Sequence, residues 1–195
     1  MEQPQRPIKI LGISGSLRGG SSSLLALRVA LEGSAALGAQ TEVLDLQELY
    51  LPMFLPQVPL EDCPDSVRLL LRKVREADAM LWAGPAYHGT ISGALKNALD
   101  YLEFLNTERP LYLTDKVVGL IATAGGAMAS VNTINAMAHV AQTLRAWMAT
   151  IQVPIGPTRD LFQNGELKDE PTRERLRMLG RQVVRFVQSR QARQG

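Results

Sequence analysis

The sequence predicts a three-layer α/β fold in which one parallel sheet of five strands lies between two layers of helices. Five short apolar runs alternate with stretches whose apolar residues recur at helical spacing. The third run, residues 77–83, is apolar on both faces after Asp78, which is typical of a strand covered by helices on each side. The strand order 2-1-3-4-5 makes the first and third strands neighbours at the point where the order reverses.

The apolar runs place the five strands. We expect them at residues 8–13, 41–46, 77–83, 117–123 and 151–155. Pro154 in the last run has no backbone N–H group to donate, so this strand is expected at an edge of the sheet. Residues 50–59 carry three prolines and are therefore expected to form a surface loop.

Helical spacing of apolar residues predicts five helices. The first helix is expected from Ser23 to an end at Gly33 or Gly38, and the second carries the apolar stripe Val67, Leu70, Leu71 and Val74. The other three are expected at residues 91–105, at residues 128–148 and from about Pro171 into the 180s. In the last helix, arginines recur every four residues at Arg173, Arg177, Arg181 and Arg185. Such a row could bind nucleic acid, but a solvated helix flank is favoured because the net charge is small.

Composition indicates a soluble globular protein. The 195 residues fit one domain over 1–195, with residues 1–7 as a flexible arm because they are polar and hold two prolines. The net charge of +2 is too small to indicate nucleic-acid binding. Cys63 is the only cysteine, so no intrachain disulfide can form. No signal peptide or membrane-spanning run is apparent, and a cytoplasmic location without a membrane partner is expected.

The stretch 12–23, which reads GISGSLRGGSSS, links the first strand to the first helix and has the features of a phosphate site. A helix N-terminus presents unpaired N–H groups and a partial positive charge, and glycines let an anion come close. Hydroxyl donors and one guanidinium are added by Ser14, Ser16, Ser21, Ser22, Ser23 and Arg18. The alternative is an ordinary Ser/Gly-rich turn with a serine cap.

Known loop motifs do not fit this stretch. It has no lysine for a Walker loop, no G-x-G for a dinucleotide fingerprint, and no cysteine for a phosphatase loop. It also misses the G-x-S-x-G nucleophile elbow by one glycine. What remains is a cradle for a terminal monophosphate.

Two further turns follow the third and fourth strands. They span residues 84–93, reading GPAYHGTISG, and residues 124–127, reading AGGA. In a parallel sheet the carboxyl ends of all strands lie at one edge, where ligands bind near the reversal of strand order. The three turns are therefore predicted to form one pocket.

These motifs resemble those of the NAD(P)H-dependent FMN reductase family of flavodoxin-like proteins, which includes quinone, azo-dye and chromate reductases. The resemblance rests on GSLRGGSSS, on PAYHGTISGALKNALDYL, on the glycine pair after the fourth strand, on LPMF at 51–54 and on FQNGELKD at 162–169. It implies that the FMN phosphate is held by Ser16, Arg18, Ser21 and Ser23, although family members often have Asn where Ser23 stands. It implies flavin-ring contacts by Pro85, Ala86, Tyr87, His88 and Gly89 along one edge and by Ala124, Gly125 and Gly126 on the pyrimidine side.

The resemblance also implies an activity. Hydride would pass from NADPH or NADH through flavin N5 to free flavin, a quinone, an azo compound or a metal oxyanion, in a homodimer or homotetramer. No catalytic side chain is expected, because the flavin carries the chemistry. No metal site is expected, since His88 and His139 are the only histidines.

Other functions stay open at this stage. A flavodoxin-type electron carrier is disfavoured by the basic net charge and by Arg18 in the loop. An FMN-binding redox sensor is a further alternative. A hydrolase that uses Ser14 or Ser16 with His88 would need no flavin. The sequence does not distinguish NADH from NADPH, nor does it identify the acceptor.

Overall fold

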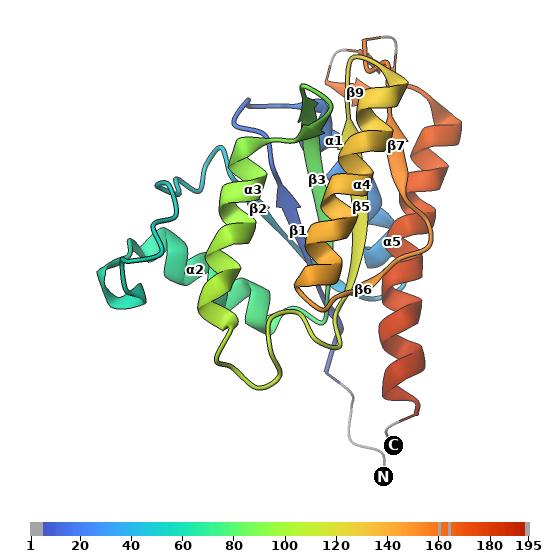
Figure 1. Ribbon diagram of the computed structural model, residues 1–195. Helices are drawn as coiled ribbons and strands as arrows, with labels where there is room; N and C mark the ends of the chain where they lie inside the picture. Colours follow the sequence, from blue (N-terminus) through green and yellow to red (C-terminus); the bar gives the residue numbers. More distant parts are fainter. Residues whose placement is uncertain (1–5, 160, 164, 194–195) are drawn as a thin grey trace.

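The computed structural model describes residues 6–159, 161–163 and 165–193. A mostly parallel sheet lies between two layers of helices (Figure 1). Its strands run in the order β2 (Gln40–Asp45), β1 (Lys9–Ser14), β3 (Ala79–Tyr87) and β5 (Val117–Thr123). Two short strands share the last position, because β6 (Trp147–Met148) pairs with the start of β5 and β7 (Val153–Ile155) with its end. The predicted order is confirmed, with the fifth strand in two pieces.

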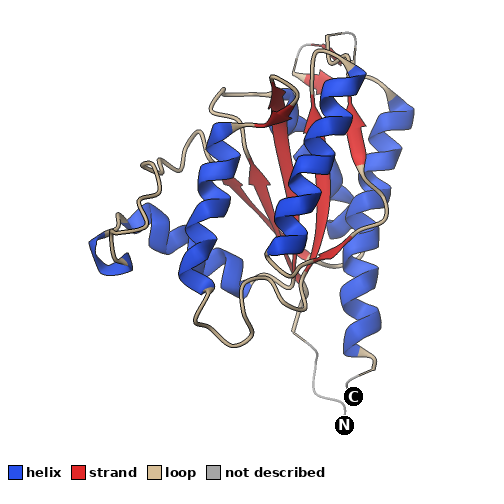
Figure 2. Ribbon diagram, viewed as in Figure 1, coloured by secondary structure: helices blue, strands red, loops and turns tan. Residues whose placement is uncertain are grey.

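Helices cover both faces of the sheet (Figure 2). On one face lie α1 (Ser22–Ala35) and α5 (Glu170–Gln191), and on the other lie α2 (Asp65–Glu76), α3 (Gly93–Asp100) and α4 (Ala127–Thr143). Successive strand residues point to opposite faces, so two cores form. Ile10, Leu81 and Ile121 pack toward α1 and α5, whereas Leu11, Met80 and Leu120 pack toward α2, α3 and α4.

Short elements complete the described chain. The 3-10 helix η1 (Leu60–Asp62) precedes α2, and η2 (Tyr101–Leu105) continues α3. A hairpin of β8 (Phe162–Gln163) and β9 (Glu166–Leu167) precedes α5. This hairpin lies within residues 162–169, one of the stretches that carry the family resemblance, of which residue 164 lies outside the described residues. No described helix combines the length and apolar character that a membrane crossing requires.

The fourth helix is shorter than the prediction of 128–148. It ends at Thr143, and Arg145 takes a left-handed backbone conformation with φ of 66°. The chain then enters β6 at Trp147 beside the start of β5. The prediction was wrong here because so short an apolar run is compatible with a strand as well as with a helix.

The third strand is longer than predicted, and part of the turn at 84–93 is regular structure. β3 continues to Tyr87 and folds back on the antiparallel strand β4 (Thr90–Ile91). His88 and Gly89 form the two-residue connection with φ of 53° and 77°. Positive φ at both central residues is the backbone of a type I′ hairpin, whose twist matches that of the strands.

The N-terminal segment is tied to the sheet at Arg6. Its guanidinium donates to both carboxylate oxygens of Asp78, at 2.8 and 2.6 Å, and the Lys9 N–H donates to the same carboxylate at 2.8 Å. Burial alone would raise the pKa of Asp78, but these hydrogen bonds outweigh burial and hold the pKa below its ordinary value. Residues 1–5 of the predicted arm lie outside the described residues.

Helices α1 and α5 cross in close contact. Gly33, one of the two predicted helix ends, lies inside α1 and is buried against α5. At Gly180 of α5, a Cβ atom would lie 1.8 Å from the carbonyl oxygen of Ala30. The Ser34 hydroxyl donates to the Gly180 carbonyl at 2.9 Å, and Arg177 forms an ion pair with Glu32 at 3.0 Å. This crossing fixes where α1 lies on the sheet.

Gly180→Ala should therefore destabilise the protein. The added methyl group meets backbone atoms that cannot rotate away, so we expect the free energy of unfolding to fall by roughly 3 kcal/mol, at the upper end of the cost of overpacking. Urea unfolding followed by circular dichroism measures the change.

Gly93→Ala is the matched control. Apart from its chain neighbours and the backbone of its own helix, no described atom lies within 4 Å of the Cβ position of Gly93, which is the first residue of α3. Its free energy of unfolding should stay within about 0.5 kcal/mol of the parent protein. Equal stability of the Gly180 and Gly93 variants would show that the helix crossing is looser than described.

Candidate functional site

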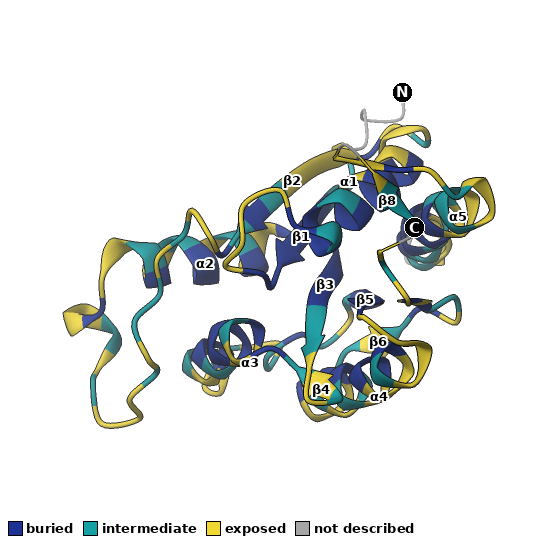
Figure 3. Cartoon of the chain, turned by 90° about the horizontal axis from the view of Figure 1, so that it is seen from above, coloured by how far each residue is buried: buried dark blue, intermediate teal, exposed yellow. Residues whose placement is uncertain are grey.

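A pocket of about 290 Å³ lies at the carboxyl ends of the strands. Figure 3 looks down on this edge of the sheet. The pocket is bounded by the loop after β1, the end of β3 and the turn after β5. Its lining residues are Ser16, Arg18, Gly20, Ser21, Ser22, Ser23, Pro85, Ala86, Tyr87, Thr123, Ala124, Gly125 and Thr158.

Most of the residues predicted for the site are brought together here. Ser16, Arg18, Ser21, Ser23, Pro85, Ala86, Tyr87, Ala124 and Gly125 all line the pocket. His88, Gly89 and Gly126 do not, although each follows a lining residue closely in the chain. The first two form the tip of the β3–β4 hairpin, and the third is the N-cap residue of α4.

The start of α1 offers unpaired backbone donors to the pocket. Ser21 is the N-cap residue, and its hydroxyl accepts from the Leu24 N–H at 3.2 Å. Within the described residues, the N–H groups of Ser22 and Ser23 have no hydrogen-bond partner. Gly20 precedes the cap with φ of 62°, a conformation that glycine adopts without strain. Unpaired donors at a helix N-terminus form a site for an anion.

Side chains of the same loop strengthen that site. Arg18 is exposed, and no carboxylate among the described residues forms an ion pair with its guanidinium. The Ser16 hydroxyl accepts from the Arg18 N–H at 3.2 Å and keeps its own hydrogen to donate. One free cation and a buried hydroxyl therefore stand beside the N-terminus of α1.

Ser23 differs from the other three residues predicted to hold a phosphate. Its hydroxyl oxygen lies 2.7 Å from the hydroxyl oxygen of Thr123, and the two form a buried hydrogen bond. Only 1% of Ser23 is exposed. Its backbone N–H is free, whereas its side chain is already engaged.

The other side of the pocket is built mainly from backbone. Pro85 of β3 pairs with Thr123, the last residue of β5, so the final residues of β3 extend beyond the end of β5. The Ser92 hydroxyl at the N-cap of α3 donates to the Gly15 carbonyl at 2.7 Å and thereby fixes the first loop against the hairpin. The N–H groups of Gly125 and Gly126 have no partner within the part of the chain that the structure describes. These two groups are therefore backbone donors that a ligand could use at the start of α4.

Two of the lining residues were not predicted from any motif. Thr123 ends an apolar run and was assigned only to its strand, and Thr158 follows β7. The Thr158 N–H donates to the Ala124 carbonyl at 3.0 Å, which brings it to the pocket. No local signal in the sequence marks this contact.

The hydrolase alternative finds little support in this geometry. Ser14 is fully buried, and its hydroxyl has no hydrogen-bond partner among the described residues. His88 is exposed on the hairpin. Ser16 lines the pocket, but within the described part of the chain its hydroxyl is bonded to the Arg18 N–H and not to His88, which does not line the pocket. A serine hydroxyl without an adjacent base is not activated as a nucleophile. Among the described residues, no group of histidine, cysteine or acidic side chains is arranged to hold a metal ion.

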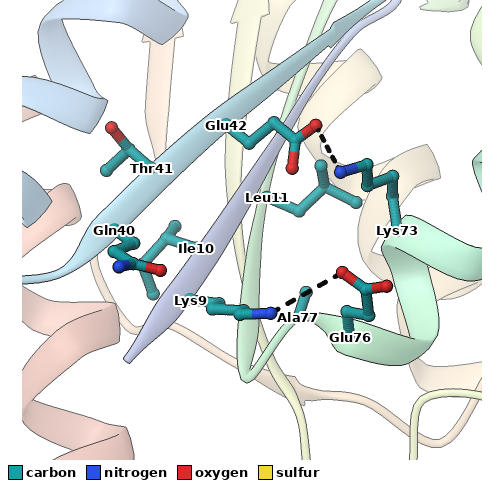
Figure 4. A pocket seen from close by; sticks show the side chains of 9 residues that line it. All are labelled: Lys9, Ile10, Leu11, Gln40, Thr41, Glu42, Lys73, Glu76 and Ala77. Atoms are coloured by element: carbon teal, nitrogen blue, oxygen red, sulfur yellow. Dashed lines mark ion pairs between the residues drawn. The ribbon is translucent and has the colours of Figure 1, made fainter. Parts of the chain in front are cut away.

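A second cavity, of about 440 Å³, lies near the amino ends of β1 and β2 (Figure 4). Its charged side chains are paired with one another. Lys73 Nζ lies 2.9 Å from Glu42 Oε1, and Lys9 Nζ lies 3.6 Å from Glu76 Oε2. Because these charges already neutralise each other, this cavity has less to offer an anion than the pocket beside Arg18.

Comparison with known proteins gives a consistent result. The model of the family described as NADPH-dependent FMN reductase matches residues 8–159. An NAD(P)H-dependent FMN reductase of Pseudomonas aeruginosa is 32% identical over 172 residues, which cover 86% of this chain and 88% of that protein. An NAD(P)H:quinone oxidoreductase of Solanum tuberosum is 32% identical over 125 residues, which cover 63% of this chain and 61% of that protein.

A solved structure supports the fold. The flavodoxin-type, WrbA-like protein of Agrobacterium tumefaciens superposes with a TM-score of 0.65 at 15% identity, covering 94% of this chain and 98% of that one. The flavodoxin-like α/β arrangement is thus confirmed.

Proposed function

Because this chain belongs to the NADPH-dependent FMN reductase family, we propose that its pocket at the carboxyl ends of the strands binds FMN and that it reduces a small-molecule acceptor with NADPH or NADH. Enzymes of this family are NAD(P)H-dependent flavin and quinone reductases. The observation that carries the proposal is the meeting in one pocket of a helix N-terminus, an arginine and two backbone turns; among the described residues, the first two N–H groups of that helix and the guanidinium of that arginine have no partner.

The residues at the α1 end fit a phosphate group. This end of the pocket offers hydrogen-bond donors to an anion. They are the Ser22 and Ser23 N–H groups, the Ser16 hydroxyl and the Arg18 guanidinium.

The residues at the other end fit a flat ring system. Pro85, Ala86 and Tyr87 supply one wall, and the turn at Ala124 and Gly125 supplies another. Free N–H groups at Gly125 and Gly126, at the start of α4, would stabilise negative charge on the pyrimidine side of a reduced ring. His88 and Gly89 stay proposed ring-edge contacts beside Tyr87.

When bound, FMN would supply the redox chemistry by accepting hydride at N5 and passing electrons to an acceptor. The chain supplies binding, orientation and electrostatic stabilisation. Candidate acceptors are free flavin, a quinone, an azo compound and a metal oxyanion. We infer a cytoplasmic site of action, in keeping with a lone, buried, free cysteine at Cys63.

We also infer that the protein forms a homodimer or homotetramer. Large apolar side chains are exposed on α4 and on the proline-rich loop, with Met128 79% and Met53 73% exposed. Between α3 and α4 lies a cavity of about 500 Å³ whose lining includes Phe54, Leu99 and Leu144. Exposed apolar surface of this kind favours contact with another protein surface.

Gel filtration with light scattering tests this association. We expect a mass of two or four chains at micromolar concentration. A single monomer peak that keeps full activity would contradict the inference.

The Arg18→Ala variant tests the phosphate site. A charged hydrogen bond contributes roughly 1.5 to 3 kcal/mol, so the dissociation constant for FMN should rise by roughly 10- to 150-fold. Quenching of flavin fluorescence during titration measures it. Riboflavin, which lacks the phosphate, should bind the variant and the parent protein equally well.

Arg28→Ala is the matched control. Arg28 is an exposed arginine on α1 that does not line the pocket. Its removal changes the net charge by the same amount and should leave the affinity for FMN unchanged. Unchanged FMN affinity in the Arg18 variant as well would place the phosphate elsewhere.

A further inference from the structure

One buried hydrogen bond joins the two ends of the pocket. Ser23 Oγ and Thr123 Oγ1 lie 2.7 Å apart and are separated by 100 residues in the sequence. Ser23 is the second residue of α1, and Thr123 is the last residue of β5. Both residues line the pocket.

Each residue belongs to a backbone segment that would contact a different part of the proposed ligand. Ser23 carries one of the free N–H groups at the start of α1. Thr123 is followed by Ala124 and Gly125, which line the ring side. The bond therefore sets the spacing between the anion-binding end and the ring-binding end.

Neither hydroxyl is well placed to bind a ligand itself. The exposed fractions of Ser23 and Thr123 are 1% and 5%. Each hydroxyl is also engaged with the other, so loss of either leaves a buried polar group without its partner. Their effect on a ligand is exerted through the backbone segments that they connect.

We propose that Ser23 and Thr123 are positioning residues whose hydrogen bond fixes the N-terminus of α1 relative to the turn after β5, so that the phosphate and the ring of one FMN molecule are bound together. This inference rests on the proposed function. When two parts of one ligand bind sites held at a matching spacing, binding of one part raises the effective concentration of the other. Breaking the bond loosens the spacing and reduces that advantage.

The measured quantity is the ratio of the dissociation constants of riboflavin and FMN, which reports what the phosphate adds once the ring is bound. In Ser23→Ala and in Thr123→Val this ratio should fall roughly three- to tenfold, the size expected from one hydrogen bond. The double variant should show the same fall as either single variant, because both remove one shared contact. Riboflavin affinity alone should change less than the FMN affinity.

Two controls separate positioning from loss of stability. Ser34 is another buried serine of α1, and its hydroxyl donates to the Gly180 carbonyl at 2.9 Å. Ser34→Ala should lower the free energy of unfolding and leave the ratio unchanged. Thr123→Ser keeps the hydroxyl and should retain the parent ratio. Urea unfolding of every variant shows that it is folded under the binding conditions.

Two results would overturn the inference alone. In the first, the parent protein binds FMN, and both single variants have the same ratio of riboflavin to FMN dissociation constants as the parent protein. The other is a fall in Ser23→Ala without a fall in Thr123→Val, which would show that Ser23 contacts the phosphate directly. A parent protein that binds neither flavin would instead refute the proposed function together with this inference.

Discussion

The parallel direction of the strands is the constraint on which the pocket depends. Because β1, β3 and β5 all run the same way, the segments that follow them leave the sheet at one edge. The position of α1 is fixed at two points, by the crossing with α5 at Gly180 and by the Ser23–Thr123 bond at its start. The bond in the first turn thus sets where the backbone N–H groups at the start of α1 point, while the crossing holds the body of the helix on the sheet.

The division of chemistry within the pocket follows from this construction. The α1 end presents hydrogen-bond donors and a cation, whereas the β3 and β5 ends present backbone groups, small side chains and Tyr87. Such an arrangement is suited to binding and orienting a ligand, and the described part of the chain places no nucleophile beside a base there. It suits a protein that leaves the reaction to a cofactor, as family membership indicates.

Most of the fold could be predicted from the sequence, because buried parallel strands and amphipathic helices leave regular apolar patterns. The split fifth strand could not, since nothing near Arg145 marks its left-handed conformation and the residues up to Trp147 suit a helix as well. Glycine, hydroxyl and arginine spacing identified most of the pocket. Contacts between distant segments, such as Ser23 with Thr123 and Thr158 with Ala124, depend on tertiary packing and leave no local signal.

The visible absorption spectrum of the purified protein tests the central claim most directly. FMN is added, unbound flavin is removed, and NADPH and then NADH are mixed in under anaerobic conditions. The account predicts that FMN is retained and that its absorption band bleaches rapidly with one or both nucleotides. Retained flavin that stays oxidised would contradict the reductase function and favour an electron carrier or sensor, and a protein that retains no flavin would contradict the assignment of the pocket.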